Sequence, residues 1–144
     1  MNTEKYLVDN AAQLKKYTVS LKALFTKIDE VRKTLLNVPH TDIETIKDLL
    51  LKFTGYYSYI NEQFAKLSSL KKNKALAYYY NARVESEKNG DKFVSAPVEK
   101  ESEFAVATER EMRDMAEAYV ATCMEGIRTC RVLINNDSQV PSVD

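Results

Sequence analysis

The sequence has few of the residues that end secondary-structure elements. It contains three Gly, three Pro, one His and no Trp in 144 residues. Barrels, sandwiches and Rossmann folds need a turn after each short strand, so this scarcity argues against them. It also argues against a disordered or linker-rich chain. The sequence therefore predicts long elements joined by few turns.

Long apolar runs and a charge excess are also missing. No run of 18 apolar residues occurs, so we expect no membrane-spanning helix and no membrane contact. The N-terminus lacks the basic and then apolar pattern of a signal peptide. Lys+Arg and Asp+Glu both number 21, so the net charge is zero. We expect a cytoplasmic protein.

Cysteine is nearly absent as well. Cys123 and Cys130 stand seven positions apart in a helical pattern, about 10 Å along one face, which is too far for a mutual disulfide. We expect both to be small buried hydrophobes in a reducing compartment. The alternative is a thiol metal site, but His40 is the one histidine that could assist it. No metal or cofactor is predicted.

What the chain does contain is helical periodicity. Apolar residues step by three and four from Leu14 onward, a heptad repeat that predicts a coiled-coil-like N-terminal helix over 1–38. Its uncharged flanks indicate a wider buried face than a two-stranded zipper has. We expect this seam to hold a homo-oligomer through Leu14, Tyr17, Leu21, Leu24, Ile28, Val31 and Leu35. Whether it packs within one subunit or between subunits stays open, as does the number of subunits.

A second helix is predicted over 42–88. Pro39 ends the first helix, and Thr41 with Glu44 has the pattern of a capping box. The same steps of three and four then continue through Ile43, Ile46, Leu50, Phe53, Tyr57, Ile60, Phe64 and Leu67.

A third helix follows a turn. Asn89-Gly90-Asp91 predicts a loop over 89–96, and Pro97 suits the first position of a helix over 97–135. Its expected buried stripe includes Phe104, and Gly126 is expected to allow close approach of a neighbour. Residues 136–144 are expected to be a flexible tail. The predicted fold is all-α and a single domain, with three long helices: the N-terminal helix and an antiparallel helical hairpin over 42–135.

Catalytic motifs are missing from the chain. It has no phosphate-binding loop, no dinucleotide fingerprint, no H-E-x-x-H and no nucleophile elbow. The carboxylates between 99 and 117 include no E-x-x-H pair of the kind used in helical metal sites, so a solvated face explains them. We predict that the protein is not an enzyme.

The charge distribution gives the functional signal. Between Gln63 and Val84 there are five basic residues and no acids, together with three consecutive tyrosines. Cations that follow phosphates and rings that stack on bases are typical of single-stranded nucleic-acid binding. The candidate contacts are Lys66, Lys71, Lys72, Lys74, Tyr78, Tyr79 and Arg83.

A simpler explanation of the lysines is also open. In an antiparallel hairpin that turns near residue 92, Lys71–Lys74 lie opposite Glu109, Glu111 and Asp114. The lysines would then form salt bridges across the hairpin, and at least one tyrosine would pack. The two explanations are compatible, because an oligomer repeats a modest basic patch many times.

The stretch 63–136 resembles the recombination-mediator family of tailed phages, the UvsY type. The resemblance lies in a Lys-rich helix that runs into tyrosines (LKKNKALAYYYNAR), a polar loop (KNGDKF), an acidic helix start (EKESE) and a long final helix from AEAY to GIRTCRVLI. It implies a ring-like oligomer that binds single-stranded DNA, contacts the single-strand-binding protein and helps to load a RecA-like recombinase. It would make Lys71, Lys72, Lys74 and Arg83 the DNA contacts, and the protein would act in the host cytoplasm.

A non-enzymatic structural or interaction protein is the alternative. The long apolar seams suit a coiled-coil assembly, such as a virion component or scaffold. They equally suit an inhibitor that binds a host protein and no DNA.

Overall fold

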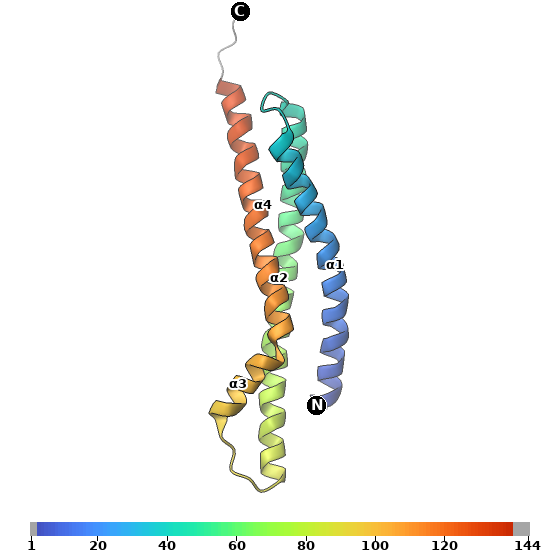
Figure 1. The fold of residues 1–144 in the computed structure, drawn as a ribbon, viewed down its shortest axis with the longest axis vertical. Coiled ribbons are helices and arrows are strands. Elements are labelled where there is room, and N and C mark those ends of the chain that lie inside the picture. Colours follow the sequence, from blue (N-terminus) through green and yellow to red (C-terminus); the bar gives the residue numbers. More distant parts are fainter. Residues whose placement is uncertain (1–2, 140–144) are drawn as a thin grey trace, which may run out of the picture. The chain divides into compact units, whose positions relative to one another are not determined.

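The computed structural model describes the backbone of residues 3–139 and the side chains of residues 11–137, and this part of the chain is all-α, as predicted (Figure 1). It contains four helices and no strand within the described range. They are α1 (Thr3–Asn37), α2 (Ile43–Lys88), α3 (Ser95–Ala105) and α4 (Ala107–Gln139). None of these described helices is both long enough and apolar enough to cross a membrane.

The helices contribute to two compact units. Unit 1 combines α1 up to Val19 with Phe64–Met115. Unit 2 combines Ser20–Gln63 with α4 from Ala116 onward. Each of the three long helices α1, α2 and α4 therefore supplies residues to both units.

The start of α2 is capped by Asp42. The Thr45 backbone N–H donates to Asp42 Oδ1 at 3.3 Å, and the Thr45 hydroxyl donates to Oδ2 at 2.7 Å. The carbonyl of Asp42 accepts the first helical hydrogen bond, from Ile46 at 3.1 Å. The predicted cap, Thr41, is therefore wrong by one residue. A charged carboxylate at this position also interacts favourably with the helix dipole.

The end of α2 at Lys88 agrees with the prediction and has a local cause. Gly90 adopts a φ of 73°, the left-handed conformation that glycine reaches without strain. The N–H of Gly90 donates to the carbonyl of Glu87 at 3.2 Å, and the N–H of Asp91 donates to that of Ser86 at 3.0 Å. This pair of hydrogen bonds is the Schellman motif, which satisfies the last carbonyls of the helix.

The predicted third helix is divided in two. Val94 caps α3, so the helix begins at Ser95 and Pro97 occupies its third position. Val106 interrupts the helix with φ −106° and ψ 17°, and α3 turns away from the line of α4 at this residue (Figure 1). At its other end α4 continues to Gln139, so residues 136–139, which were predicted to belong to a flexible tail, are helical. Residues 140–144 of that tail lie outside the described residues.

The break changes which side chains are buried. Phe104 was expected in the buried stripe, but it is 81% exposed. That prediction assumed one uninterrupted helical phase through this segment. With the phase reset at Val106, Val106 itself, Glu109 and Met112 take the interior positions.

Unit 2 has a three-helix core. Parts of α1, α2 and α4 lie side by side in this unit (Figure 1). Its buried apolar side chains are Leu21, Leu24, Phe25, Ile28, Val31, Ile46, Leu49, Phe53, Ile60, Ala116, Cys123 and Cys130. They confirm most of the predicted seams, except that Leu49 is buried and Leu50 only half-buried.

The residues predicted to hold an oligomer therefore lie largely in the interior of one chain. Leu14, Leu21, Leu24, Ile28 and Val31 are buried, while Tyr17 and Leu35 are half-buried. Packing within the chain already explains their apolar character. Self-association stays a prediction, and it would need other surface.

Aromatic packing fixes α4 against α1 in unit 2. The rings of Phe25 and Tyr119 stack with centroids 4.1 Å apart, and the Tyr119 hydroxyl donates to Asp29 Oδ2 at 2.9 Å. Burial, together with this hydrogen bond, raises the pKa of Tyr119. Burial also raises the pKa of the Cys123 thiol to about 11, so Cys123 is an inert core thiol, as the sequence predicts.

Gly126 allows a close contact between α2 and α4. A Cβ built on Gly126 would lie 2.6 Å from the ring of Phe53, whose side chain is fully buried. Gly55, on α2 in the same unit, has no atom within 4 Å of such a Cβ. The expected close approach at Gly126 is thus confirmed.

Gly126→Ala should lower the free energy of unfolding by about 1–3 kcal/mol, because the new methyl group overpacks against Phe53. Gly55→Ala is the matched control and should raise it by about 0.5–1 kcal/mol, since alanine favours the helix and meets nothing. Urea denaturation followed by circular dichroism measures both. Equal stabilisation by the two substitutions would contradict the packing.

Candidate nucleic-acid interface

The basic stretch lies on the second half of α2, in unit 1. Helix-favouring residues such as Lys, Leu and Ala fill the segment 70–77, and no Gly or Pro interrupts it. Lys66, Lys72 and Arg83 are exposed. Lys71, Lys74, Tyr78 and Tyr79 are half-buried.

Lys74 occupies a core position. It follows Leu67 and Leu70 by steps of three and four along the buried face of α2. Its ammonium donates to Glu109 Oε1 at 2.6 Å, with 20% of the lysine side chain and none of the glutamate side chain exposed. The alternative explanation by salt bridges is confirmed for this lysine.

Glu109 is the important residue that the sequence did not single out as a site. It stands in the first turn of α4, where the helix dipole favours a negative charge. Its second oxygen, Oε2, is buried and finds no hydrogen-bond partner among the described residues. A carboxylate so desolvated depends on its cation, which makes Lys74 a structural residue.

Tyr78 also has a hydrogen-bond partner within the chain. Its hydroxyl donates to Glu101 Oε2 of α3 at 3.1 Å. The hydrogen bond to Glu101 is the main cause that raises the pKa of Tyr78. The contact joins α2 to α3 one helical turn beyond the Lys74–Glu109 pair.

Tyr79 and Arg83 meet at Phe93 in the loop before α3. The rings of Tyr79 and Phe93 lie edge to face, 5.4 Å apart. The Arg83 guanidinium lies 6.0 Å from the centroid of the Phe93 ring and 3.4 Å from Glu87 Oε1. Both side chains therefore help to hold the loop.

Lys71 and Lys72 of the predicted site do not have a structural contact of this kind. Neither Lys71 nor Lys72 forms an ion pair with any residue in the described part of the chain. Of the acids expected opposite them, Glu109 binds Lys74, and Asp114 binds Arg113 at 2.9 Å. The explanation by salt bridges therefore holds for Lys74. It does not account for Lys71 and Lys72.

Tyr80 is the tyrosine that the site prediction omitted. It is 62% exposed, whereas Tyr78 contacts Glu101 and Tyr79 contacts Phe93. Extending the seam from Leu70 through Lys74 to Tyr78 would have revealed this, because Tyr80 then lies about 200° around the helix from Tyr78.

No protein-family model, no curated protein and no solved structure matches this chain. Within the described residues, no group of three or more His, Cys, Asp and Glu side chains could hold a metal ion. Functional proposals therefore rest on the residues of the chain itself.

Lys74→Met should lower the free energy of unfolding by about 3 kcal/mol, since it leaves the buried Glu109 carboxylate unpaired. This is the low end for such pairs, because Lys74 keeps partial exposure. Adding Glu109→Leu should recover most of the loss, since two apolar side chains then replace the pair. Urea denaturation of the single and double variants measures this. A single variant as stable as the native chain would contradict a structural Lys74.

Proposed function

We propose that the protein is a non-enzymatic, oligomeric accessory protein that binds single-stranded DNA. In this proposal it assists a RecA-like recombinase in phage-type recombination or replication, next to a single-strand-binding protein. The observation that supports it best is the unpaired state of Lys71 and Lys72 within a stretch that holds no acidic residue. Charges without protein partners are free to neutralise phosphates.

The contacts of the seven candidate residues divide them by role. Lys66, Lys71 and Lys72 would follow the phosphates, and the exposed ring of Tyr80 would stack on a base. Lys74, Tyr78, Tyr79 and Arg83 would support this surface from within unit 1, as their contacts with α3, α4 and the loop indicate.

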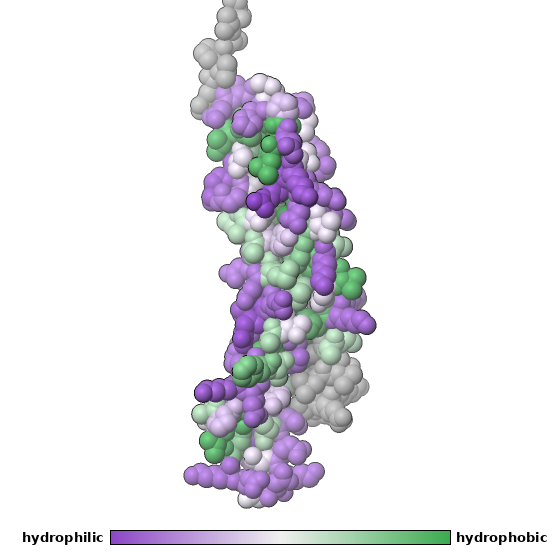
Figure 2. All heavy atoms as spheres, in the orientation of Figure 1, coloured by the Kyte–Doolittle hydropathy of each residue, from purple (hydrophilic) through white to green (hydrophobic). Residues whose placement is uncertain are grey.

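Association of several copies would strengthen a patch with so few cations. The heptad seam is buried, so the proposal places association on apolar side chains that unit 1 exposes. Leu76 is 58% exposed and Phe104 81% exposed. Figure 2 shows hydrophobic side chains over α3, among other hydrophobic patches on the same face. Within this proposal α2 pairs with α3 and the start of α4 as an antiparallel hairpin.

Lys71→Ala/Lys72→Ala should weaken binding of a fluorescent oligo-dT at least tenfold at about 50 mM salt, because two phosphate contacts disappear. The negative slope of log affinity against log salt should become shallower by about 1.4, because about 0.7 is lost with each phosphate contact. Fluorescence anisotropy at about 50 and 200 mM salt measures both. Lys47→Ala/Lys52→Ala removes the same charge from exposed positions of α2 in unit 2 and should change little.

A protein-interaction role without DNA is the second candidate. It is favoured by the internal contacts of Lys74, Tyr78, Tyr79 and Arg83, which remove four residues from the candidate DNA surface. A folded native chain that does not bind oligo-dT at 50 mM salt would overturn the DNA proposal and support this role. Affinity that survives in the double variant would overturn the assignment of Lys71 and Lys72.

A further inference from the structure

Unit 2 contains a pocket that the proposed function does not use. It is an open groove of about 480 Å³, lined by α1, α2, α4 and the turn between α1 and α2, a volume typical of small-molecule sites. Its α4 wall extends from Ala121 to Leu133, which is about 18 Å of helix. The pocket is therefore elongated along the helices.

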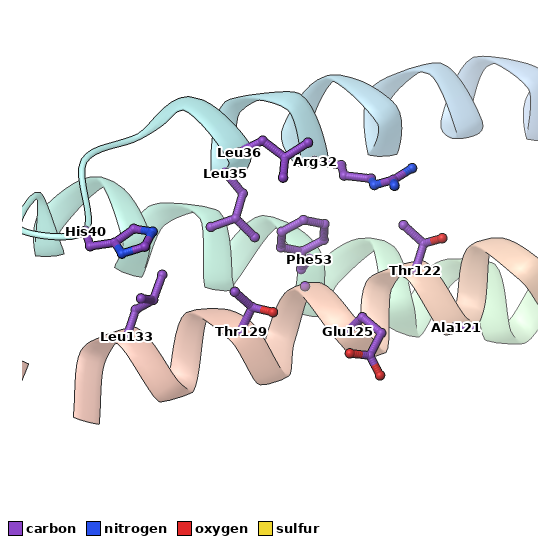
Figure 3. Close-up of a pocket in the computed structure, with 11 residues that line it drawn as sticks. Arg32, Leu35, Leu36, His40, Phe53, Ala121, Thr122, Glu125, Thr129 and Leu133 are labelled. Carbon is purple, nitrogen blue, oxygen red and sulfur yellow. The ribbon is translucent and has the colours of Figure 1, made fainter. Parts of the chain in front are cut away.

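The floor of the pocket is apolar. Leu35, Leu36 and Leu133 contribute hydrophobic surface, and beneath them Phe53 and Gly126 are buried against each other. In Figure 3, Leu35, Phe53 and Thr129 lie in the middle of the pocket, between α1 and α4. The missing Cβ of Gly126 is what lets the Phe53 ring lie against α4 at this point. An extended or flat apolar group could rest on this floor.

One end of the pocket carries a cation. Arg32 of α1 lies opposite Thr122 of α4, and His40 lies with Leu133 at the other end (Figure 3). Arg32 has no ion pair and no hydrogen bond with a residue that the structure describes. The one acidic residue in the lining, Glu125, is held by Arg128 at 2.5 Å. The charge of Arg32 also acts on the Tyr119 hydroxyl, which donates to Asp29. An anion at this end would therefore meet a guanidinium that no ion pair or hydrogen bond within the described residues holds.

We infer that this pocket binds a small amphipathic anion: an alkyl or aryl carboxylate whose charged head meets Arg32 and whose apolar body lies over Leu35, Leu36 and Leu133. A guanidinium binds a carboxylate through charge-assisted hydrogen bonds. The elongated apolar floor selects a chain or ring over a small hydrophilic anion. His40, at the far end, marks the limit of the ligand's length.

The test uses the full chain and two probes, dodecanoate and 8-anilinonaphthalene-1-sulfonate. Titration of the sulfonate should give saturable fluorescence that dodecanoate displaces. Dodecanol, which has the same chain and no charge, should displace it at least tenfold less well. Equal displacement by dodecanol would overturn the role of the anion, and absence of saturable binding would overturn the site.

Two variants locate the binding. Arg32→Gln should weaken dodecanoate at least tenfold, while Lys33→Gln, an equal charge change at the next exposed position, should have less than a twofold effect. Thr129→Phe should block the middle of the pocket and abolish binding. Thermal melts confirm that each variant folds. Native affinity in folded Arg32→Gln or Thr129→Phe would place the probe elsewhere and overturn the inference.

Discussion

The ion pair between Lys74 and Glu109 is the constraint on which the rest of unit 1 depends. A lysine at a core position of α2 requires a buried anion, and the first turn of α4 supplies it at 2.6 Å. The break at Val106, three residues before Glu109, lets α4 begin there, and α3 is left to contact α2 through Tyr78 and Glu101. Removing two charges from water is unfavourable, so the pair adds little net stability over an apolar pair, although removing only one partner is strongly destabilising.

The same pair decides how the basic stretch can function. Lys74 is paired with Glu109, whereas its neighbours on α2, Lys71 and Lys72, form no ion pair with a described residue. Arg83 and Tyr79 both contact Phe93 in the loop before α3. Unit 2 differs in kind, since its core is almost entirely apolar and Arg32 lines a pocket there. The two units therefore offer two chemically distinct surfaces.

The sequence predicted the features that follow from periodicity and turn chemistry. The seam from Leu21 to Val31 is buried, the seam from Ile46 to Leu67 alternates between buried and half-buried side chains, and Gly90 ends α2 in the expected place. The break at Val106 was not predictable in this way, because no Gly or Pro marks it and the residues around it suit a helix. In the candidate site, composition located the basic stretch. Continuing the seam from Leu67 and Leu70 would place Lys74, and not Lys72, on the buried face. The partner of Lys74 could not be read from the sequence, because it depends on how the facing helix packs.

The most direct test of this account observes the lysine ammonium groups themselves, by ¹H–¹⁵N NMR of the side chains, with and without oligo-dT. The Lys74 signal should be slow to exchange with water, because its protons are shared with a buried carboxylate, and it should stay in place when DNA is added. The signals of Lys71 and Lys72 should shift on addition of DNA. A Lys74 ammonium that exchanges as freely as Lys72, or that shifts with DNA while Lys71 and Lys72 do not, would contradict the account.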